Sequence, residues 1–407
     1  MIPRMKPYLG WDELLALFKF NDDAVERFEV EFARMFETSH AISFAYGRSA
    51  LWSFFKAAGV EDAEVVMPAY TCDVVAHAVV LSGNRPCFVD INLTDYNMNL
   101  DLFSAAITER TRAVIPTHLF GYPMDIETVS EIVQAAENRY GHKIWIIQDC
   151  AHAFGAHWNG RSVCNAGDVA LFGLNISKMF TSIFGGMLTV EDELLAGRIR
   201  DWRNSHSKQP GLSKAIRRSL YLIAVYPAFQ EFLYGIVYWL QEGTPLLDGL
   251  TKAYHLDEKI HFPPDYQDRM LDLEAQVGLS QLNKYPEIVK RRKENALYYD
   301  EHLQGLAGFE LPPLVEGATY SHYVVRVADR RSMMRTLARR GIQLGQLIEY
   351  SVPHMDAYRP YAGGRDFQNS LLCSQKTINL PIHPGLKPTQ RSWIAKCLIE
   401  AIKDGRE

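Results

Sequence analysis

The sequence predicts an α/β protein in which a mostly parallel sheet lies between helices. Through the first half of the chain, apolar runs of strand length alternate with amphipathic stretches of helix length, as in β-α-β units. The predicted strands are "AEVVMPAY", "NRPCFVDI", "TRAVIPTHLFG", "HKIWIIQD" and "GDVALFG", and predicted helices between them include "NLDLFSAAITER" and "DIETVSEIVQAAENRYG". Parallel sheets bind ligands at the carboxyl ends of their strands, so polar residues at those ends are functional candidates.

The last third of the chain predicts a smaller α+β domain. One long helix is expected over Asp272–Leu303, followed by strands at "SHYVVRVAD" and "KTINLPI" and a helix at "DRRSMMRTLARRG". We therefore predict a large domain over residues 1–275 and a small C-terminal domain over residues 276–407.

An apolar segment, Lys214–Leu247, interrupts the α/β pattern within an insertion over residues 213–262. Pro227, Gln230 and Glu231 break its apolar run, so a simple membrane span is not expected. Two interpretations stay open. The segment is either a helical insertion buried in the core or at a dimer interface, or a helix that rests in a membrane interface.

Composition narrows the class of protein. The 407 residues are 47% hydrophobic and 22% charged, which is typical of a folded chain rather than a disordered one. The net charge of -5 does not favour nucleic acid as a partner. Six cysteines without CxxC spacing predict neither a disulfide framework nor a metal site. Together with an N-terminus that lacks a signal-peptide core, they predict a cytoplasmic protein.

Two predicted strand regions end on opposite charges, Asp149 and Lys178. Pyridoxal 5′-phosphate (PLP) requires a lysine that binds it covalently, a carboxylate at its pyridine nitrogen, a flat group against its ring and N–H donors for its phosphate. Gly47, Arg48 and Ser49 open a predicted helix and could provide that phosphate site. Taken singly, a loop lysine, a capping aspartate and an N-cap serine are ordinary structural features.

Six motifs, in order along nearly the whole chain, resemble those of the DegT/StrS family of sugar aminotransferases, which belong to the aspartate aminotransferase superfamily and have fold type I. They are "GRSAL", "VVMPAYTCDVV" with "FVDI", "AVIPTHLFGYPMDI", "QDCAHAFGA", "GDVALFGLNISKMF" and "INLPIHPGL". The resemblance implies PLP as cofactor, interconverting with pyridoxamine 5′-phosphate. It also implies transfer of an amino group from an amino acid, usually glutamate, to a keto-sugar.

The resemblance assigns roles to individual positions. It makes Lys178 the lysine that binds the cofactor and moves protons, and Asp149 the partner of the pyridine nitrogen. His152 falls where the family places a glutamine or histidine near the ring oxygen. A lysine rather than a histidine at position 178 disfavours the dehydratase branch of the family. His118 is expected to pack behind the site.

Four positions depart from the family pattern. Arg48 and Gly173 stand where a threonine and a serine usually help to bind the phosphate. Gln267 replaces an asparagine that usually reaches the partner subunit's phosphate, and Cys72 replaces a stacking aromatic residue.

We expect other side chains to compensate for these departures. The guanidinium of Arg48 suits phosphate because it donates through two N–H groups at once. Asn175 and Ser177 could add donors, and Tyr70 could supply part of the stacking surface.

The resemblance also implies a homodimer in which both chains line each site, with Gln267 acting on the partner. Tyr350 and His354 in "LIEYSVPHMDAY" are candidates for substrate contacts. Asn204 and His206 in "DWRNSHS", which resembles the loop after the lysine strand, are two more.

Three alternatives stay open. The acceptor could be a cyclitol, a lipid-linked sugar or another ketone. The altered phosphate and stacking positions could mark a non-catalytic homologue, although retention of Lys178 and Asp149 argues against this. The segment over residues 214–247 could bring the protein to a membrane surface.

Overall fold

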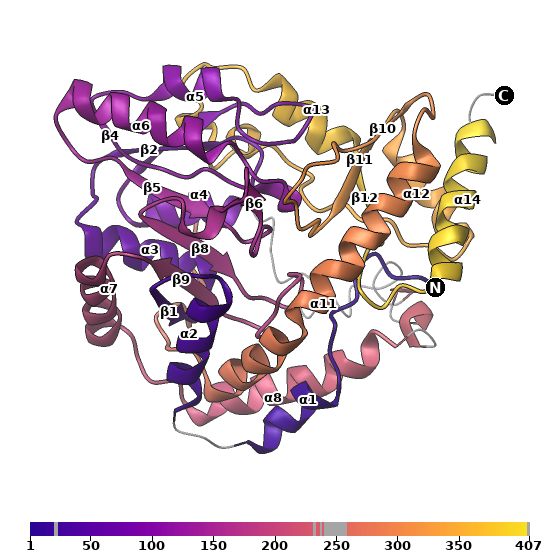
Figure 1. The fold of residues 1–407 in the computed structure, drawn as a ribbon, viewed down its shortest axis with the longest axis horizontal. Coiled ribbons are helices and arrows are strands. Elements are labelled where there is room, and N and C mark those ends of the chain that lie inside the picture. The colour runs from indigo at the N-terminus through magenta and orange to yellow at the C-terminus, as the bar shows by residue number, and fades with distance from the viewer. Residues whose placement is uncertain (20–22, 231–232, 237, 240–258, 405–407) are drawn as a thin grey trace.

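A seven-stranded sheet lies between two layers of helices (Figure 1). The computed structural model describes residues 1–19, 23–230, 233–236, 238–239 and 259–404. The sheet order is β1 (His40–Phe44), β9 (Gly186–Val190), β8 (Val169–Gly173), β5 (Trp145–Asp149), β4 (Thr111–Val114), β2 (Glu64–Pro68) and β3 (Arg85–Val89). Strands β8, β5, β4, β2 and β3 are mutually parallel, whereas β9 is antiparallel to both of its neighbours. The predicted α/β class with a mostly parallel sheet is confirmed.

The five parallel strands coincide with the predicted apolar runs because both of their faces are covered. In β2, Val65 and Met67 pack in one hydrophobic cluster and the intervening Val66 packs in another. This alternation is the period of two that a pleated strand requires. The sequence does not predict β1 and β9. β1 pairs only with β9, at the edge of the sheet, and β9 pairs with both neighbours in antiparallel register.

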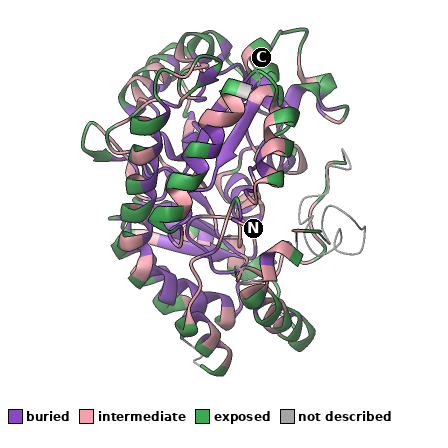
Figure 2. Cartoon of the chain, turned by 90° about the vertical axis from the view of Figure 1, so that its right-hand side faces the viewer, coloured by how far each residue is buried: buried purple, intermediate pink, exposed green. Residues whose placement is uncertain are grey.

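Different helices cover the two faces of the sheet. One face packs against α3 (Gly47–Ala58), α4 (Asp73–Leu81) and α7 (Glu193–His206). The other packs against α2 (Ala24–Met35), α5 (Leu100–Ala106), α6 (Ile126–Tyr140) and the first part of α11 (Asp272–Leu303). Figure 2 shows the strands buried inside and the outer sides of the helices exposed.

The predicted long helix α11 leads from the large sheet to a C-terminal region (Figure 1). There β10 (Phe309–Glu310), β11 (Tyr323–Val327) and β12 (Thr377–Leu380) form an antiparallel sheet. It packs with α12 (Arg330–Arg339) and α14 (Pro388–Asp404). The chain start also belongs here, because Ile2 bridges to Ile342. The predicted boundary near residue 275 falls inside α11 and stays a prediction.

The insertion begins with helix α8 (Leu212–Ala228), while residues 240–258 lie outside the described part of the chain. The inner side of α8 buries Lys214 and Leu222. Its outer side carries a stripe of apolar residues that are 51–77% exposed, at helical spacing: Leu212, Ile216, Leu220 and Ile223. The outer side of α8 is therefore not buried in the core of the single chain. No helix over the described residues is long and apolar enough to span a membrane.

Candidate active site

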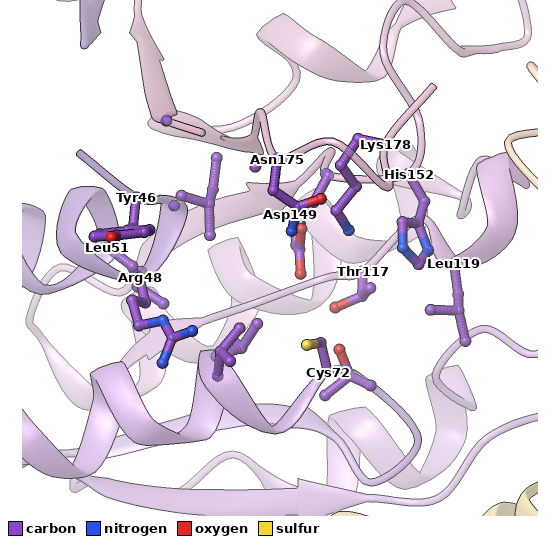
Figure 3. Close-up of a pocket in the computed structure, with 18 residues that line it drawn as sticks. Tyr46, Arg48, Leu51, Cys72, Thr117, Leu119, Asp149, His152, Asn175 and Lys178 are labelled. Carbon is purple, nitrogen blue, oxygen red and sulfur yellow. Dashed lines mark hydrogen bonds between the residues drawn. The ribbon is translucent and has the colours of Figure 1, made fainter. Parts of the chain in front are cut away.

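A cavity lies at the carboxyl ends of β5 and β8, where the predicted PLP residues converge (Figure 3). The residues that line it come from several separate segments between Tyr46 and Gly185. Of the predicted cofactor residues it includes Gly47, Arg48, Cys72, Asp149, His152, Gly173, Asn175 and Lys178. The sheet topology thus brings together motifs that are far apart in the sequence, at the edge where parallel strands bind ligands.

Lys178 and Asp149 lie next to each other in the cavity (Figure 3). Desolvation lowers the pKa of Lys178 and raises that of Asp149, and each charge only partly relieves the other. The Asp149 carboxylate accepts a hydrogen bond from the Ala151 N–H at 3.1 Å. Within the described residues it forms no ion pair with Lys178. The two groups therefore present opposite charges to the cavity rather than neutralising each other.

Parallel pairing places Thr117 beside Asp149. Thr117 follows β4 and bridges to Asp149 at the end of β5. The Thr117 hydroxyl is buried, faces the cavity and has no hydrogen-bond partner. A buried hydroxyl without a partner is costly, so a ligand with a polar atom at this wall would be stabilising.

His152 enters the cavity beside Lys178 (Figure 3). Its Nδ1 accepts a hydrogen bond from the Phe120 N–H at 3.3 Å. Burial, Lys178 and His322 hold the pKa of His152 well below its usual value, so the ring is neutral. A neutral imidazole that accepts at Nδ1 carries its proton on Nε2, which makes His152 an N–H donor.

The N-terminus of α3 closes the end of the cavity that Arg48 lines (Figure 3). Gly47 starts this helix, and its first N–H groups have no partner within the helix. Close packing demands glycine at Gly186, because a Cβ there would lie 2.4 Å from the Gly47 nitrogen. A Cβ on Gly173 would make only an ordinary contact, 3.5 Å from the Lys178 side chain. Close packing therefore does not require glycine at position 173, and a serine Cβ would fit there without a clash.

An ion-pair network holds the wall of the cavity at Tyr46. The Tyr46 hydroxyl donates to Asp265 and accepts from Arg218, both at 2.8 Å. Arg218 also contacts the buried Glu274 at 3.1 Å, and its guanidinium lies 3.5 Å from the centre of the Phe184 ring. Arg218 belongs to α8, so the inner side of the insertion helix anchors the cavity wall.

Several predicted cofactor residues lie outside the cavity lining. The Tyr70 ring is buried and its hydroxyl bonds to the Ile348 carbonyl and to Thr377, which does not support a stacking role. Ser49 is buried in the first turn of α3 and does not reach the cavity. Ser177 donates to the Asn175 side chain, so it orients a residue of the lining rather than lining it.

The predicted substrate residues also lie outside the lining of this cavity in the single chain. Tyr350 hydrogen-bonds to the first residue of α4, and His354 is exposed. Asn204 and His206 are exposed in the last turn of α7, not in a loop as the sequence predicts. Gln267 is half-buried beside α8, and its action on a partner subunit stays a prediction.

The sequence does not predict that His322 lies beside the site. His322 precedes β11 in the C-terminal region, and its ring centre lies 5.1 Å from that of His152. Its backbone N–H donates to the Phe120 carbonyl at 3.3 Å. No local pattern marks it, because only the packing of two distant regions brings it here. His118 instead packs behind the site, where burial lowers its pKa to about 4.

Comparisons with known proteins agree with this arrangement. A model of the DegT/DnrJ/EryC1/StrS aminotransferase family matches residues 18–399. The chain is 27% identical to the spore coat polysaccharide biosynthesis protein SpsC of Bacillus subtilis, over 99% of this chain and 96% of that protein. It is 24% identical to the GDP-perosamine synthase of Vibrio cholerae, over 98% of both chains.

Solved structures show the same fold. A putative sugar aminotransferase from Streptococcus pneumoniae superposes with a TM-score of 0.78 at 21% identity, over 99% of this chain and 100% of that one. The aminotransferase PseC of Helicobacter pylori superposes with a TM-score of 0.77 at 17% identity, over 99% of both chains. The fold is therefore that of the sugar aminotransferases, as the sequence predicts.

The network at Tyr46 predicts how stability depends on pH. Burial raises the pKa of Glu274 to about 7, even though Arg218 and Lys214 lower it. The folded protein thus holds a proton that the unfolded chain has lost, and the stability this contributes disappears as the pH rises through about 7. Between about pH 5 and 8, the free energy of unfolding measured with urea should fall by up to about 3 kcal/mol in the wild type. Glu274→Gln should not show this fall. The control Glu287→Gln, at an exposed position, should show the same fall as the wild type. An equal fall in Glu274→Gln would contradict this account.

Proposed function

The chain belongs to the DegT/DnrJ/EryC1/StrS aminotransferase family, and we propose that it uses PLP to move an amino group from L-glutamate to a keto-sugar. The observation that carries this proposal is the cavity in which Lys178 and Asp149 present opposite charges beside a helix N-terminus. Relatives named GDP-perosamine synthase and UDP-N-acetyl-3-dehydro-alpha-D-glucosamine 3-aminotransferase support a nucleotide-linked acceptor.

The cavity residues fit PLP group by group. Lys178 would bind the cofactor covalently and Asp149 would hold a proton on its pyridine nitrogen. The unpartnered Thr117 hydroxyl and the His152 N–H are donors suited to oxygens on the ring. The start of α3 at Gly47 suits the phosphate.

When bound, PLP supplies an electron sink for charge that develops on the substrate carbon. The chain supplies the proton chemistry. Desolvation lowers the pKa of Lys178, so a free amine at its Nζ is easier to obtain near neutral pH. That amine accepts the proton from the amino donor and returns it during transfer. Burial raises the pKa of Asp149, so a positive group beside it would be needed to keep the carboxylate ionised. Neutral His152 donates without competing for the proton.

Two departures from the family pattern are accommodated by this cavity. Arg48 lines it next to the α3 N-terminus, so its guanidinium replaces the usual threonine as phosphate donor. Burial raises the pKa of Cys72 to about 11, so its thiol is neutral and acts as a small apolar surface against the ring.

We also propose a homodimer that covers the apolar stripe of α8. The helix touches the predicted trans segment, because Lys214 pairs with Asp265 and Asp268, which flank Gln267. Exposed apolar residues of the neighbouring N-terminal segment extend the stripe: Trp11, Leu15 and Phe18. A membrane surface is the rival occupant of this face.

The dimer proposal predicts that Leu220→Glu in α8 shifts the protein toward monomer in sedimentation velocity. A buried carboxylate without a partner opposes association. Leu194→Glu, at an exposed apolar position on α7, should leave the oligomer unchanged. If the wild type is a monomer and floats with anionic vesicles, the dimer proposal is wrong and a membrane surface covers the stripe.

Amino transfer itself is tested with 15N-labelled L-glutamate, nucleotide keto-sugars and cyclitol ketones, with mass spectrometry of the products. Lys178→Ala should lower the rate by about a thousandfold or more, because no other lysine among the described residues lines the cavity to move the proton. Equilibrium dialysis should still detect PLP bound by the remaining contacts. Lys208→Ala, at an exposed lysine, should transfer at the wild-type rate. Turnover that survives in Lys178→Ala would exclude the proposed role.

The role of Arg48 is tested by PLP affinity. Arg48→Ala should weaken binding by about ten- to a hundredfold, because charged hydrogen bonds contribute about 1.5–3 kcal/mol. Lys56→Ala on the same helix, at a surface ion pair with Glu61, should bind as tightly as the wild type. An unchanged dissociation constant for Arg48→Ala would show that phosphate binding does not depend on the guanidinium.

A further inference from the structure

A second group of buried polar side chains lies next to the cavity, at one end of the C-terminal sheet. His322 immediately precedes β11 and His383 follows β12. In the antiparallel register Tyr323 pairs with Leu380, so both histidines lie at the same end of the sheet. Helix α11 adds Arg292, whose Nη1 donates to the carbonyl of residue 321 at 2.6 Å.

This basic cluster, Arg292, His322 and His383, lacks a counter-charge. Arg292 is 6% exposed, its Nε has no hydrogen-bond partner, and it forms no ion pair with a carboxylate among the described residues. His383 is 3% exposed and neither of its ring nitrogens has a partner. A buried cation and a buried imidazole left in this state are costly.

The charges around the cluster are positive. Burial, Arg292 and Lys6 lower the pKa of His383 to about 3. The pKa of His322 is also lowered, by burial and by the charges of Arg292, Lys178 and Arg4. None of the charges that perturb either ring is an acid, so the described residues give the cluster no negative charge.

The cluster lies next to one wall of the cavity and is held rigidly. The His322 ring lies 5.1 Å from that of His152, which lines the cavity. Helix α11 fixes the segment after β12, because the Tyr299 hydroxyl donates to the carbonyl of residue 381 at 2.9 Å. Asn295 donates to the carbonyl of Ile382 at 3.4 Å. Lys178 and Arg292 both lower the pKa of His322, so His322 lies within electrostatic reach of the cavity lysine and of the cluster arginine.

We propose that the basic cluster binds the side-chain carboxylate of the amino donor, which must then be a dicarboxylic amino acid. This proposal rests on the proposed aminotransferase function. A carboxylate would supply the missing negative charge and accept from the Arg292 Nε and a His383 N–H. An amide in its place would leave the guanidinium without a counter-charge, so glutamate would be selected over glutamine.

Binding is tested on the PLP-loaded protein with glutarate, a dicarboxylate that has no amino group to transfer. Isothermal titration should give at least tenfold weaker binding to Arg292→Gln than to the wild type. Arg291→Gln removes the exposed neighbouring arginine and should bind normally. Arg292→Lys restores the charge and should recover part of the affinity. If Arg292→Gln does not fold, as judged by thermal unfolding, His383→Gln should show the same loss.

A kinetic measurement separates failure of this site from failure of the aminotransferase function. For L-glutamate, Arg292→Gln should raise KM at least tenfold with little change in kcat, whereas its KM for L-glutamine should not rise. Equal glutarate binding by the wild type and Arg292→Gln, or none by the wild type, overturns the site whatever the activity. Arg292-dependent glutarate binding without amino transfer overturns the function and leaves an anion site.

Discussion

The structure depends on burying charged groups that the chain does not neutralise by itself. Lys178 and Asp149 lie in one cavity without a direct ion pair, and desolvation shifts the pKa of each toward its neutral form. Such an arrangement is unfavourable in an empty protein and becomes favourable when a ligand brings the complementary charges. The same constraint applies to Arg292. Folding therefore creates electrostatic demands that the cofactor and the donor would meet.

The insertion helix connects this cavity to the outer surface. On its inner side Arg218 holds the Tyr46 hydroxyl and contacts Glu274, so α8 supports the wall of the cavity next to the start of α3. On its outer side the apolar stripe requires a covering surface. Whatever covers the stripe acts on the same helix that fixes Tyr46. Association and cofactor binding would then be coupled through one rigid element.

The sequence predicts what local patterns determine. The parallel strands, the α11 helix and the placement of Lys178 and Asp149 at strand ends follow from periodicity and motif order. Long-range packing determines the rest. Tyr70 follows its strand at a promising position, yet its hydroxyl is bonded inside the C-terminal region. His322 and Arg292 carry no local signal, because they matter only after α11 and β11 pack against the large sheet.

The most direct test of the central claim is the absorbance spectrum of the purified protein with added PLP, before and after excess L-glutamate. We expect a visible band distinct from that of free PLP, formed through Lys178, which L-glutamate bleaches as pyridoxamine 5′-phosphate forms. A band that glutamate leaves unchanged would contradict glutamate as the donor. No bound chromophore at all would contradict catalysis, and the departures at Arg48, Cys72, Gly173 and Gln267 would then mark a lost site.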